Sequence, residues 1–514
     1  MTPRWRSLVR LTVWLLLGVC LCGSLADIIH RLRRPAAPAY LAGWREAART
    51  VCSGTVGVWC ENAREPAPLD RARLMAVNWE LRPQAAVPCD GHGAFASVKH
   101  LIVTSSCRSA TRDRLMTEGW TLGWANDFAT VWTHSPEELR PPRSPHAVGW
   151  AREAIGVGVV VLLAAVLLYP LKDDGWTSER RTLFEAGMIF LILSAITVIH
   201  TVQPPNGLGV QAGKAALWFA AGGWPDGFFT RPEFAVYQPS YPPGLTMLSG
   251  LAMIVSGGAG ERLVQLIVPA AVGGLYLALV QPGTGWHARL AAVAFVLAPI
   301  SLRMTAGFYA EPLAAMLLAV GWRCVRKGRI LVGWMVLGNA GLFRTEGFIL
   351  AGILFSLERL RLGITRTTVM SGLLAFGPSV LWHVLVRLLG GSVYDFDFCS
   401  VPDLGRIVSA GGEVLSCLGA GFRSLGGGPL LALGLALGWQ SQSDCGRHML
   451  GCPVAVLSVA FMLVLFGFCT SAHLPWMLST YLPRLLWTAM VLELQESSVR
   501  NRPSGFSGGA ILIR

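Results

Sequence analysis

The sequence predicts an all-α polytopic membrane protein with about 11 to 13 transmembrane helices, plus a small α/β segment outside the membrane near the N-terminus. Composition is the first reason. Hydrophobic residues make up 53% of the 514 positions and charged residues only 14%, whereas soluble domains carry about 25% charged residues. The second reason is a series of uninterrupted apolar runs. Membrane strands alternate polar and apolar residues, so continuous runs favour helices that face lipid.

The N-terminus begins with a basic stretch that contains Arg4, Arg6 and Arg10, and an apolar run follows it. We interpret residues 1–24 as a signal anchor whose arginines keep the N-terminus in the cytoplasm. A cleaved signal peptide is the alternative, but no clear small-residue cleavage site follows the apolar run.

Residues 25–147 form a hydrophilic segment of domain size, expected outside the cytoplasm. Residues 41–51 have a helical pattern, and residues 96–106 and 127–134 have a strand pattern. The segment's arginines do not prevent export, because the positive-inside rule weakens in loops longer than about 60 residues.

Four cysteines lie in this hydrophilic segment: Cys52, Cys60, Cys89 and Cys107. In an oxidising compartment they become disulfide candidates. Cys52–Cys60 and Cys89–Cys107 are the pairs that we consider first, although three pairings are possible and the sequence does not choose among them. The absence of a Cys-x-x-Cys motif argues against a zinc or redox site.

Residues 148–493 are expected to form the multi-helix transmembrane domain, and residues 494–514 a cytoplasmic tail. The basic runs 323–329 and 358–366 are predicted to be cytoplasmic. We counted membrane crossings forward from the N-terminus and backward from these basic runs. The two counts differ by one crossing between Ser240 and Ser301. We therefore expect either 241–257 or 263–281 to be embedded in the membrane without spanning it. The apolar segments are 149–169, 183–202, 241–257, 263–281, 288–302, 308–323, 329–343, 346–358, 366–390, 428–440, 449–470 and 475–493.

The formal net charge of +13 fits positive-inside loops that meet anionic lipid. Nucleic acid is not an expected partner, because the basic residues are scattered near helix ends. A lipid bilayer is the expected surroundings, with both termini in the cytoplasm.

Charged and aromatic residues at the predicted outer face form the candidate site. A charge flanked by apolar runs, such as Glu311, Arg344 or Glu346, indicates a functional site because charges are costly at membrane depth. Ordinary explanations stay open: both glutamates could be helix-terminal charges near water, and Asp226 could serve only a turn. The outer clusters also contain Arg231, Tyr309, Asp395, Asp397, Asp403, His473, Trp476 and Tyr481.

Four motifs in order resemble the GT-C superfamily of polytopic membrane glycosyltransferases. They are a loop ending in YQPSYPPG (237–244), then FYAEPLAAMLLA (308–319), GLFRTEGFILA (341–351) and HLPWMLSTYLPRLL (473–486). The resemblance covers roughly residues 183–493. In bacterial members of this kind, a sugar moves from a polyprenyl-phosphate donor to an acceptor at the outer face of the inner membrane.

The resemblance implies roles for particular residues. An outer-loop carboxylate acts as the base, and cations and aromatic side chains bind the donor phosphate and the sugar. The partners implied are a polyprenyl-phosphate sugar and a glycan, lipid or protein acceptor. No cofactor is certain, and a divalent metal near Asp395 and Asp397 is an open alternative. The catalytic candidates are Asp226, Glu233 and Glu311; the substrate-binding candidates are Lys214, Tyr237, Tyr241, Arg303, Arg344, Glu346 and Arg484.

Two alternatives come from other functional classes. One is a lipid or sugar transporter or flippase, although no internal repeat of the transporter kind is evident. The other is a non-catalytic membrane scaffold of the same fold. Its best support is Gly209, which stands where the family places an acidic residue early in the loop.

Overall fold

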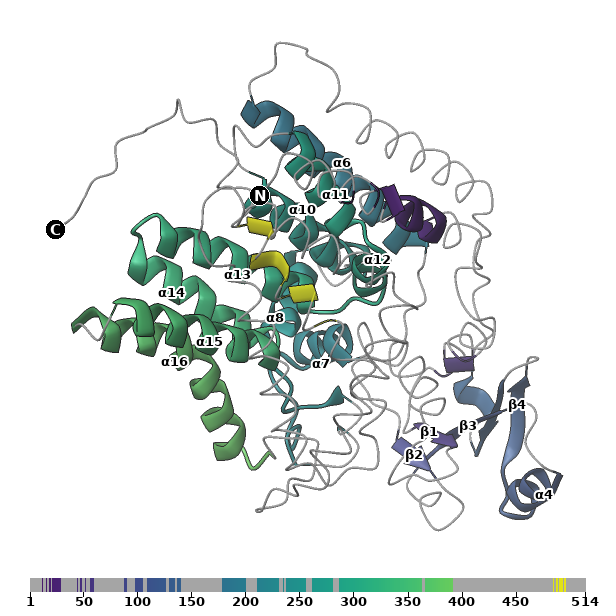
Figure 1. Ribbon diagram of the computed structural model, residues 1–514. Coiled ribbons are helices and arrows are strands. Elements are labelled where there is room, and N and C mark those ends of the chain that lie inside the picture. Colours follow the sequence, from purple (N-terminus) through teal and green to yellow (C-terminus); the bar gives the residue numbers. More distant parts are fainter. Residues whose placement is uncertain are drawn as a thin grey trace, which may run out of the picture.

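The computed structural model describes positions between 12 and 28 and between 44 and 51 in part, then 56–59, 87–89, 98–104, 109–125, 129–134 and 136–139. It further describes residues 178–199, 210–230, 234, 237–255, 261–280, 286–362, 366–391 and helical positions between 484 and 495. Helices gather into one bundle, and a small sheet lies to one side of it (Figure 1). The mostly helical class is confirmed for these residues.

The small sheet belongs to the hydrophilic N-terminal segment. Its strand order is β2-β1-β3-β5-β4, with β2-β1-β3 parallel and β3-β5-β4 antiparallel. Apolar residues such as Ile102 and Val131 are fully buried in its core. The predicted α/β character and both predicted strands are confirmed. The elements are β1 (Val56–Trp59), β2 (Val87–Cys89), β3 (His100–Thr104), α4 (Ser109–Thr117), β4 (Thr121–Ala125), β5 (Ala129–Thr133) and η2 (Pro136–Glu138).

The strand register bears on the cysteines. Cys89 ends β2 and lies opposite Trp59 of β1, the residue that precedes Cys60 in the sequence. Cys52, Cys60 and Cys107 themselves lie outside the described residues, so the disulfide pairing stays a prediction.

In the described part of the chain, the bundle includes helices α6 to α16, and most of them match a predicted apolar segment. Two differences stand out: α7 lies in the predicted loop before YQPSYPPG, and the segment 288–302 is divided between α11 and α12. The predicted segments 149–169, 428–440 and 449–470 lie outside the described residues. The helices are α6 (Ser178–Ile199), α7 (Gly213–Ala221), α8 (Gly244–Val255), α9 (Glu261–Gln265), α10 (Ile267–Leu279), α11 (Trp286–Val296), α12 (Pro299–Ala306), α13 (Glu311–Arg326), α14 (Ile330–Asn339), α15 (Thr345–Leu362) and α16 (Arg366–Leu388), with a short 3-10 turn η6 (Ala340–Leu342) before α15.

Local chemistry explains several helix boundaries. Pro299 and Pro312 stand in the first turns of α12 and α13, where a missing backbone N–H costs nothing. Gly328, at φ +80°, makes the tight turn from α13 to α14, and this left-handed backbone conformation favours glycine.

Helix α8 bears on the mismatch of one crossing between Ser240 and Ser301. It has 12 residues and is therefore about 18 Å long, well short of a hydrocarbon core of about 30 Å. Leu245 and Met253, near its two ends, share a core cluster with Val264, Val268 and Leu313 at the start of α13. Helix α10, in the segment 263–281, has 13 residues and is similarly short. Which of the two segments is embedded without spanning therefore stays a prediction.

Few of the described helices are long and apolar enough to cross a membrane. Among the described residues, Thr367–Leu388 is the one helix long and apolar enough to cross a membrane. Helices α11 and α12 would form a second span if the pair, which is bent by 44°, is treated as one broken helix. Only 28% of the apolar window in Thr367–Leu388 is buried, which is unlike the core helix of a soluble protein. The full polytopic architecture therefore stays a prediction.

Close contacts between helices α13 to α16 depend on glycine. A Cβ on Gly321 would lie 2.8 Å from the carbonyl oxygen of Gly333, and one on Gly338 would lie 2.8 Å from that of Ala375. Backbones approach this closely only where no side chain intervenes. The glycines thus set the spacing of α13, α14 and α16, and α13 begins with a residue of the site described below.

We expect Gly338→Ala to lower the free energy of unfolding by about 1–3 kcal/mol, because the new methyl group would press on the backbone of α16. Gly377→Ala on α16 is the matched control, since a Cβ there meets nothing within 4 Å. Thermal unfolding of the purified variants measures both. A Gly338→Ala variant as stable as the native protein would contradict this packing.

Candidate functional site

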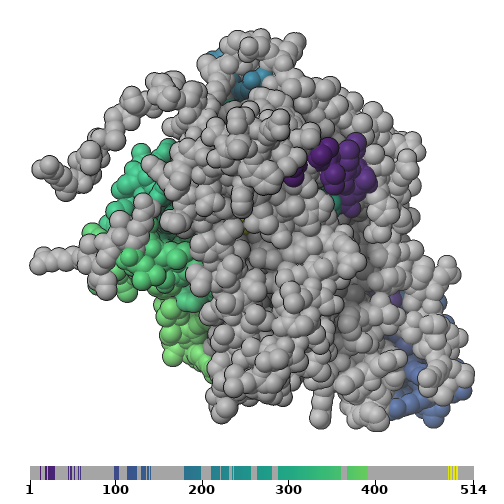
Figure 2. Space-filling view, in the orientation of Figure 1, coloured from purple at the N-terminus to yellow at the C-terminus, as the bar shows by residue number. Residues whose placement is uncertain are grey.

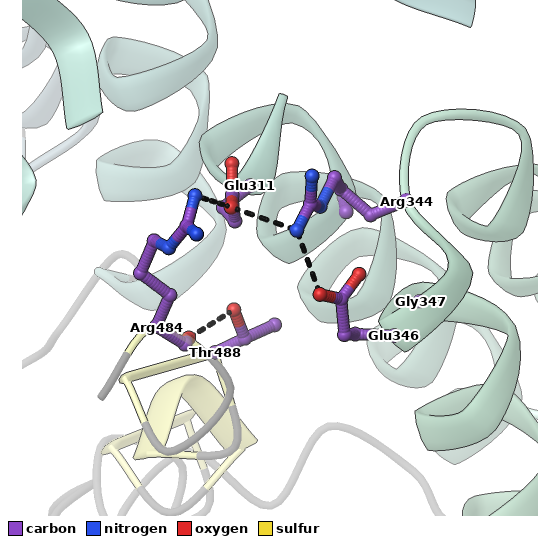
Figure 3. A pocket seen from close by; sticks show the side chains of 7 residues that line it. Glu311, Arg344, Glu346, Gly347, Arg484 and Thr488 are labelled. Atoms are coloured by element: carbon purple, nitrogen blue, oxygen red, sulfur yellow. Dashed lines mark hydrogen bonds and ion pairs between the residues drawn. The ribbon is translucent and has the colours of Figure 1, made fainter. Parts of the chain in front are cut away.

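Four charged side chains from three separate segments meet around one pocket (Figure 3). Glu311 is the first residue of α13, and Arg344 and Glu346 stand at the start of α15. Arg484 comes from a helical position near the C-terminus. The helix starts hold these charges because a carboxylate is stabilised near the positive N-terminal end of a helix.

Glu311 is the centre of the ion-pair network. Its Oε1 accepts a hydrogen bond of 2.7 Å from Nη1 of Arg484 and lies 3.3 Å from Nη2 of Arg344. The same Nη2 of Arg344 donates a 2.7 Å hydrogen bond to Glu346. One chain of charge pairs therefore joins all four residues, with two cations and two carboxylates.

The network is withdrawn from water. Glu311 and Arg344 are each 4% exposed and Arg484 is 8% exposed. Buried charges of this kind are tolerated only when paired. The second carboxylate oxygen of Glu311, Oε2, is buried and has no hydrogen-bond partner among the described residues. It is an acceptor available to a donor that enters the site.

A small cavity lies between the four charges. Its volume of about 10 Å³ has room for roughly one water molecule. The hydroxyl of Thr488, on its wall, donates to the backbone carbonyl of Arg484 one turn earlier. The lining residues are Glu311, Ala314, Arg344, Glu346, Gly347, Arg484 and Thr488.

Aromatic rings cover the cations of the network. The guanidinium carbon of Arg344 lies 5.1 Å from the centre of the Tyr241 ring, and Nζ of Lys214 lies 5.7 Å from the same ring. Arg484 stands 4.8 Å from the ring of Tyr309. These distances are typical of cation–π contacts. Tyr241 thus connects the loop before α8 to the buried charges.

Lys214 is a buried cation on α7, 1% exposed. Its ammonium group donates to the backbone carbonyl of Gln238 at 3.2 Å. Gln238 has φ +48°, an uncommon conformation for a residue with a side chain. The lysine and this strained turn together hold the loop that carries Tyr241.

The structure brings together most, but not all, of the residues that the sequence proposed. Glu311, Arg344, Glu346 and Arg484 share one cavity, and Lys214 and Tyr241 border them through the cation–π contacts. The sequence did not single out Thr488 and Gly347, which also line the cavity. Thr488 lies one helical turn after Arg484, so helical spacing could have indicated it.

Several other candidates lie elsewhere or cannot be placed. Asp226 is exposed on the turn after α7, and Arg303 is exposed on α12; neither lines the cavity. Tyr237 is buried in an aromatic cluster with Phe228 and Phe234. Glu233, Arg231, Gly209, Asp395, Asp397, Asp403, His473, Trp476 and Tyr481 lie outside the described residues.

Metal binding was examined in the same residues. Within the described part of the chain, no group of three or more His, Cys, Asp or Glu side chains could hold a metal ion. The metal alternative at Asp395 and Asp397 falls outside that part and stays untested.

A second buried charge pair lies away from the cavity, between α6, α10 and α11. Arg289 donates to Oε2 of Glu185 at 2.7 Å, and the hydroxyl of Tyr276 donates to the same oxygen at 2.5 Å. Glu185 is completely buried. The sequence analysis did not identify these residues, because each stands alone in its own apolar stretch.

Comparison with protein-family models, with characterised proteins and with solved structures gave no match. The function must therefore be argued from the site itself.

The site's chemistry can be stated from its atoms. A buried carboxylate oxygen without a partner can accept a proton from an entering hydroxyl group. Guanidinium groups bind phosphate oxygens well because their N–H donors match the spacing of two oxygens. The cluster therefore combines a candidate base with candidate phosphate ligands.

Proposed function

We propose that this protein is a polytopic membrane glycosyltransferase that moves a sugar from a polyprenyl-phosphate donor to an acceptor at the outer face of the inner membrane. The observation that carries the proposal is the meeting of Glu311, Arg344 and Arg484, which come from distant parts of the chain, in one buried cluster. Three of the four motifs that resemble the GT-C superfamily contribute one of these residues each.

Under this proposal Glu311 is the general base. Its Oε2 accepts the proton of the acceptor hydroxyl, while Oε1 stays bonded to Arg484. Arg344, Arg484 and Lys214 would stabilise the phosphate that leaves the sugar. Tyr241 would position the donor beside them. Asp226, exposed on its turn, has less structural support for the role of base than the sequence suggested.

Membrane placement is supported by the exposed apolar surface. Helix α16 is mostly uncovered, and residues along its length are exposed. An apolar surface of this extent indicates contact with lipid or with another apolar partner. A lipid-linked donor would reach the site from the lipid that contacts this surface. The exposed apolar residues of α16 are Val369, Met370, Leu373, Val380, Leu381, Val384, Leu385 and Leu388.

The test is sugar transfer by membranes that contain the Glu311→Gln variant, supplied with radiolabelled polyprenyl-phosphate pentose or hexose donors. Loss of a general base typically lowers a rate by about 10²–10⁴-fold, and we expect a loss in that range. Glu179→Gln, which makes the same change at an exposed site on α6, should transfer sugar at the native rate. Full transfer by Glu311→Gln would remove Glu311 from the mechanism.

A non-catalytic scaffold of the same fold is the second candidate. It is favoured by the small cavity, which has room for about one water molecule, and by the mutual pairing of the four charges. The two proposals differ in one measurement. A scaffold would show no sugar transfer from any polyprenyl-phosphate donor. Breaking its charge network would still lower its free energy of unfolding.

A further inference from the structure

Exposed cations gather at the turn between α13 and α14. Arg326, Lys327 and Arg329 lie within four consecutive positions, and all three side chains are exposed. Gly328 makes the turn among them, so the three cations lie at the end of the bundle where α13 connects to α14.

The connection between α15 and α16 lies at the same end of the bundle. Trp334 on α14 packs against Phe355 on α15, with ring centres 5.1 Å apart. Helix α14 runs away from the turn and α15 runs toward that end, so the residues before Trp334 and after Phe355 lie on the same side of this contact. Arg359 follows Phe355 by one helical turn and donates to Thr368 of α16 at 3.1 Å. We call Arg326, Lys327, Arg329 and Arg359 the basic end.

Exposed apolar side chains begin directly beside these cations. Leu331 and Val332 open α14, and Leu360, 85% exposed, follows Arg359. Val369 and Met370 continue the surface on α16. Figure 2 shows the green surfaces of this part of the chain uncovered along one side of the molecule. A row of cations above an apolar surface matches the boundary between lipid headgroups and acyl chains.

The basic end lies opposite the buried site. Glu311 begins α13 and Arg326 ends it. The helix has 16 residues and is therefore about 24 Å long. Arg344 and Glu346 likewise begin α15, and Arg359 stands near its end. The two charged regions are thus separated by nearly the thickness of a hydrocarbon core.

We propose that the basic end is a binding surface for anionic phospholipid headgroups, on the leaflet opposite the candidate site. The inference rests on the membrane placement in the proposed function, but not on sugar transfer. The physical basis is charge complementarity: each Lys or Arg at an anionic membrane surface strengthens binding by about fivefold. Removing three cations should therefore weaken binding by about a hundredfold.

The experiment measures binding of short-chain phosphatidylglycerol and phosphatidylcholine to the purified full chain in neutral detergent, without any sugar donor. We expect the native chain to bind phosphatidylglycerol at least tenfold more tightly than phosphatidylcholine, and less tightly as salt is raised, because salt screens exposed charges. The triple variant Arg326→Gln, Lys327→Gln, Arg329→Gln should lose that preference. The double variant Arg326→Lys, Arg329→Lys should keep it.

The matched control is Arg387→Gln, which removes an exposed cation near the other end of α16. It should bind phosphatidylglycerol like the native chain. Equal binding of both lipids by the native chain, or unchanged binding by the triple variant, would overturn the inference. So would displacement of the lipid by an equal concentration of glycerol phosphate, because that would indicate a phosphate site rather than a lipid surface. None of these outcomes depends on whether the chain transfers sugar.

Discussion

Glu311→Leu is expected to lower the free energy of unfolding by about 3–5 kcal/mol, because the change removes the carboxylate that two buried guanidinium groups share. An apolar side chain fills similar space but compensates neither Arg344 nor Arg484. Thermal or denaturant unfolding of the purified protein measures the loss.

A double variant separates the charge effect from the loss of packing. In Glu311→Leu, Arg484→Met the unbalanced cation is gone, and Arg344 keeps its 2.7 Å bond to Glu346. Replacing both members of a buried pair by apolar residues is often neutral or stabilising, so stability should return to near the native value. Under the proposed function, sugar transfer should stay abolished in this double variant, because the proposed base is absent. A double variant no more stable than Glu311→Leu would show that the pair does not act as a unit.

Arg289→Met should produce a loss of similar size, about 3–5 kcal/mol, at the second buried pair. The change leaves the buried carboxylate of Glu185 with the hydroxyl of Tyr276 but without its guanidinium partner. The double variant Glu185→Leu, Arg289→Met should recover most of that stability. Both values come from the same unfolding measurement.

The two charge pairs therefore differ in one respect. Under the proposed function, the double variant Glu185→Leu, Arg289→Met should transfer sugar at the native rate per folded molecule. The double variant Glu311→Leu, Arg484→Met should not transfer sugar. Neither Glu185 nor Arg289 lines the cavity. Loss of transfer in the stable Glu185–Arg289 double variant would indicate that the second pair also serves the reaction.

Several features of the fold could be predicted from local sequence. Most of the described helices follow the predicted apolar segments, because a continuous apolar stretch with proline or glycine at its ends favours a helix. Helix α7 is not among them, since it lies in the predicted loop before YQPSYPPG. The strands at His100–Thr104 and Ala129–Thr133 were likewise evident from their β-branched residues. Glu311, Arg344 and Glu346 were identified because each charge interrupts an apolar run.

The sequence alone determined the mostly helical class, most helix positions and the isolated charges, because these depend on residues close together in the chain. Only the tertiary structure decided which charges meet. Glu311 and Arg484 are 173 positions apart, and Glu185 and Arg289 are 104 apart. Such contacts depend on how the helices pack, which glycines such as Gly321 and Gly338 control through close backbone approach. The basic runs 323–329 and 358–366 had already indicated a face opposite the site, because lysine and arginine favour the cytoplasmic side. The same packing left Asp226 exposed, and no local pattern determines that exposure.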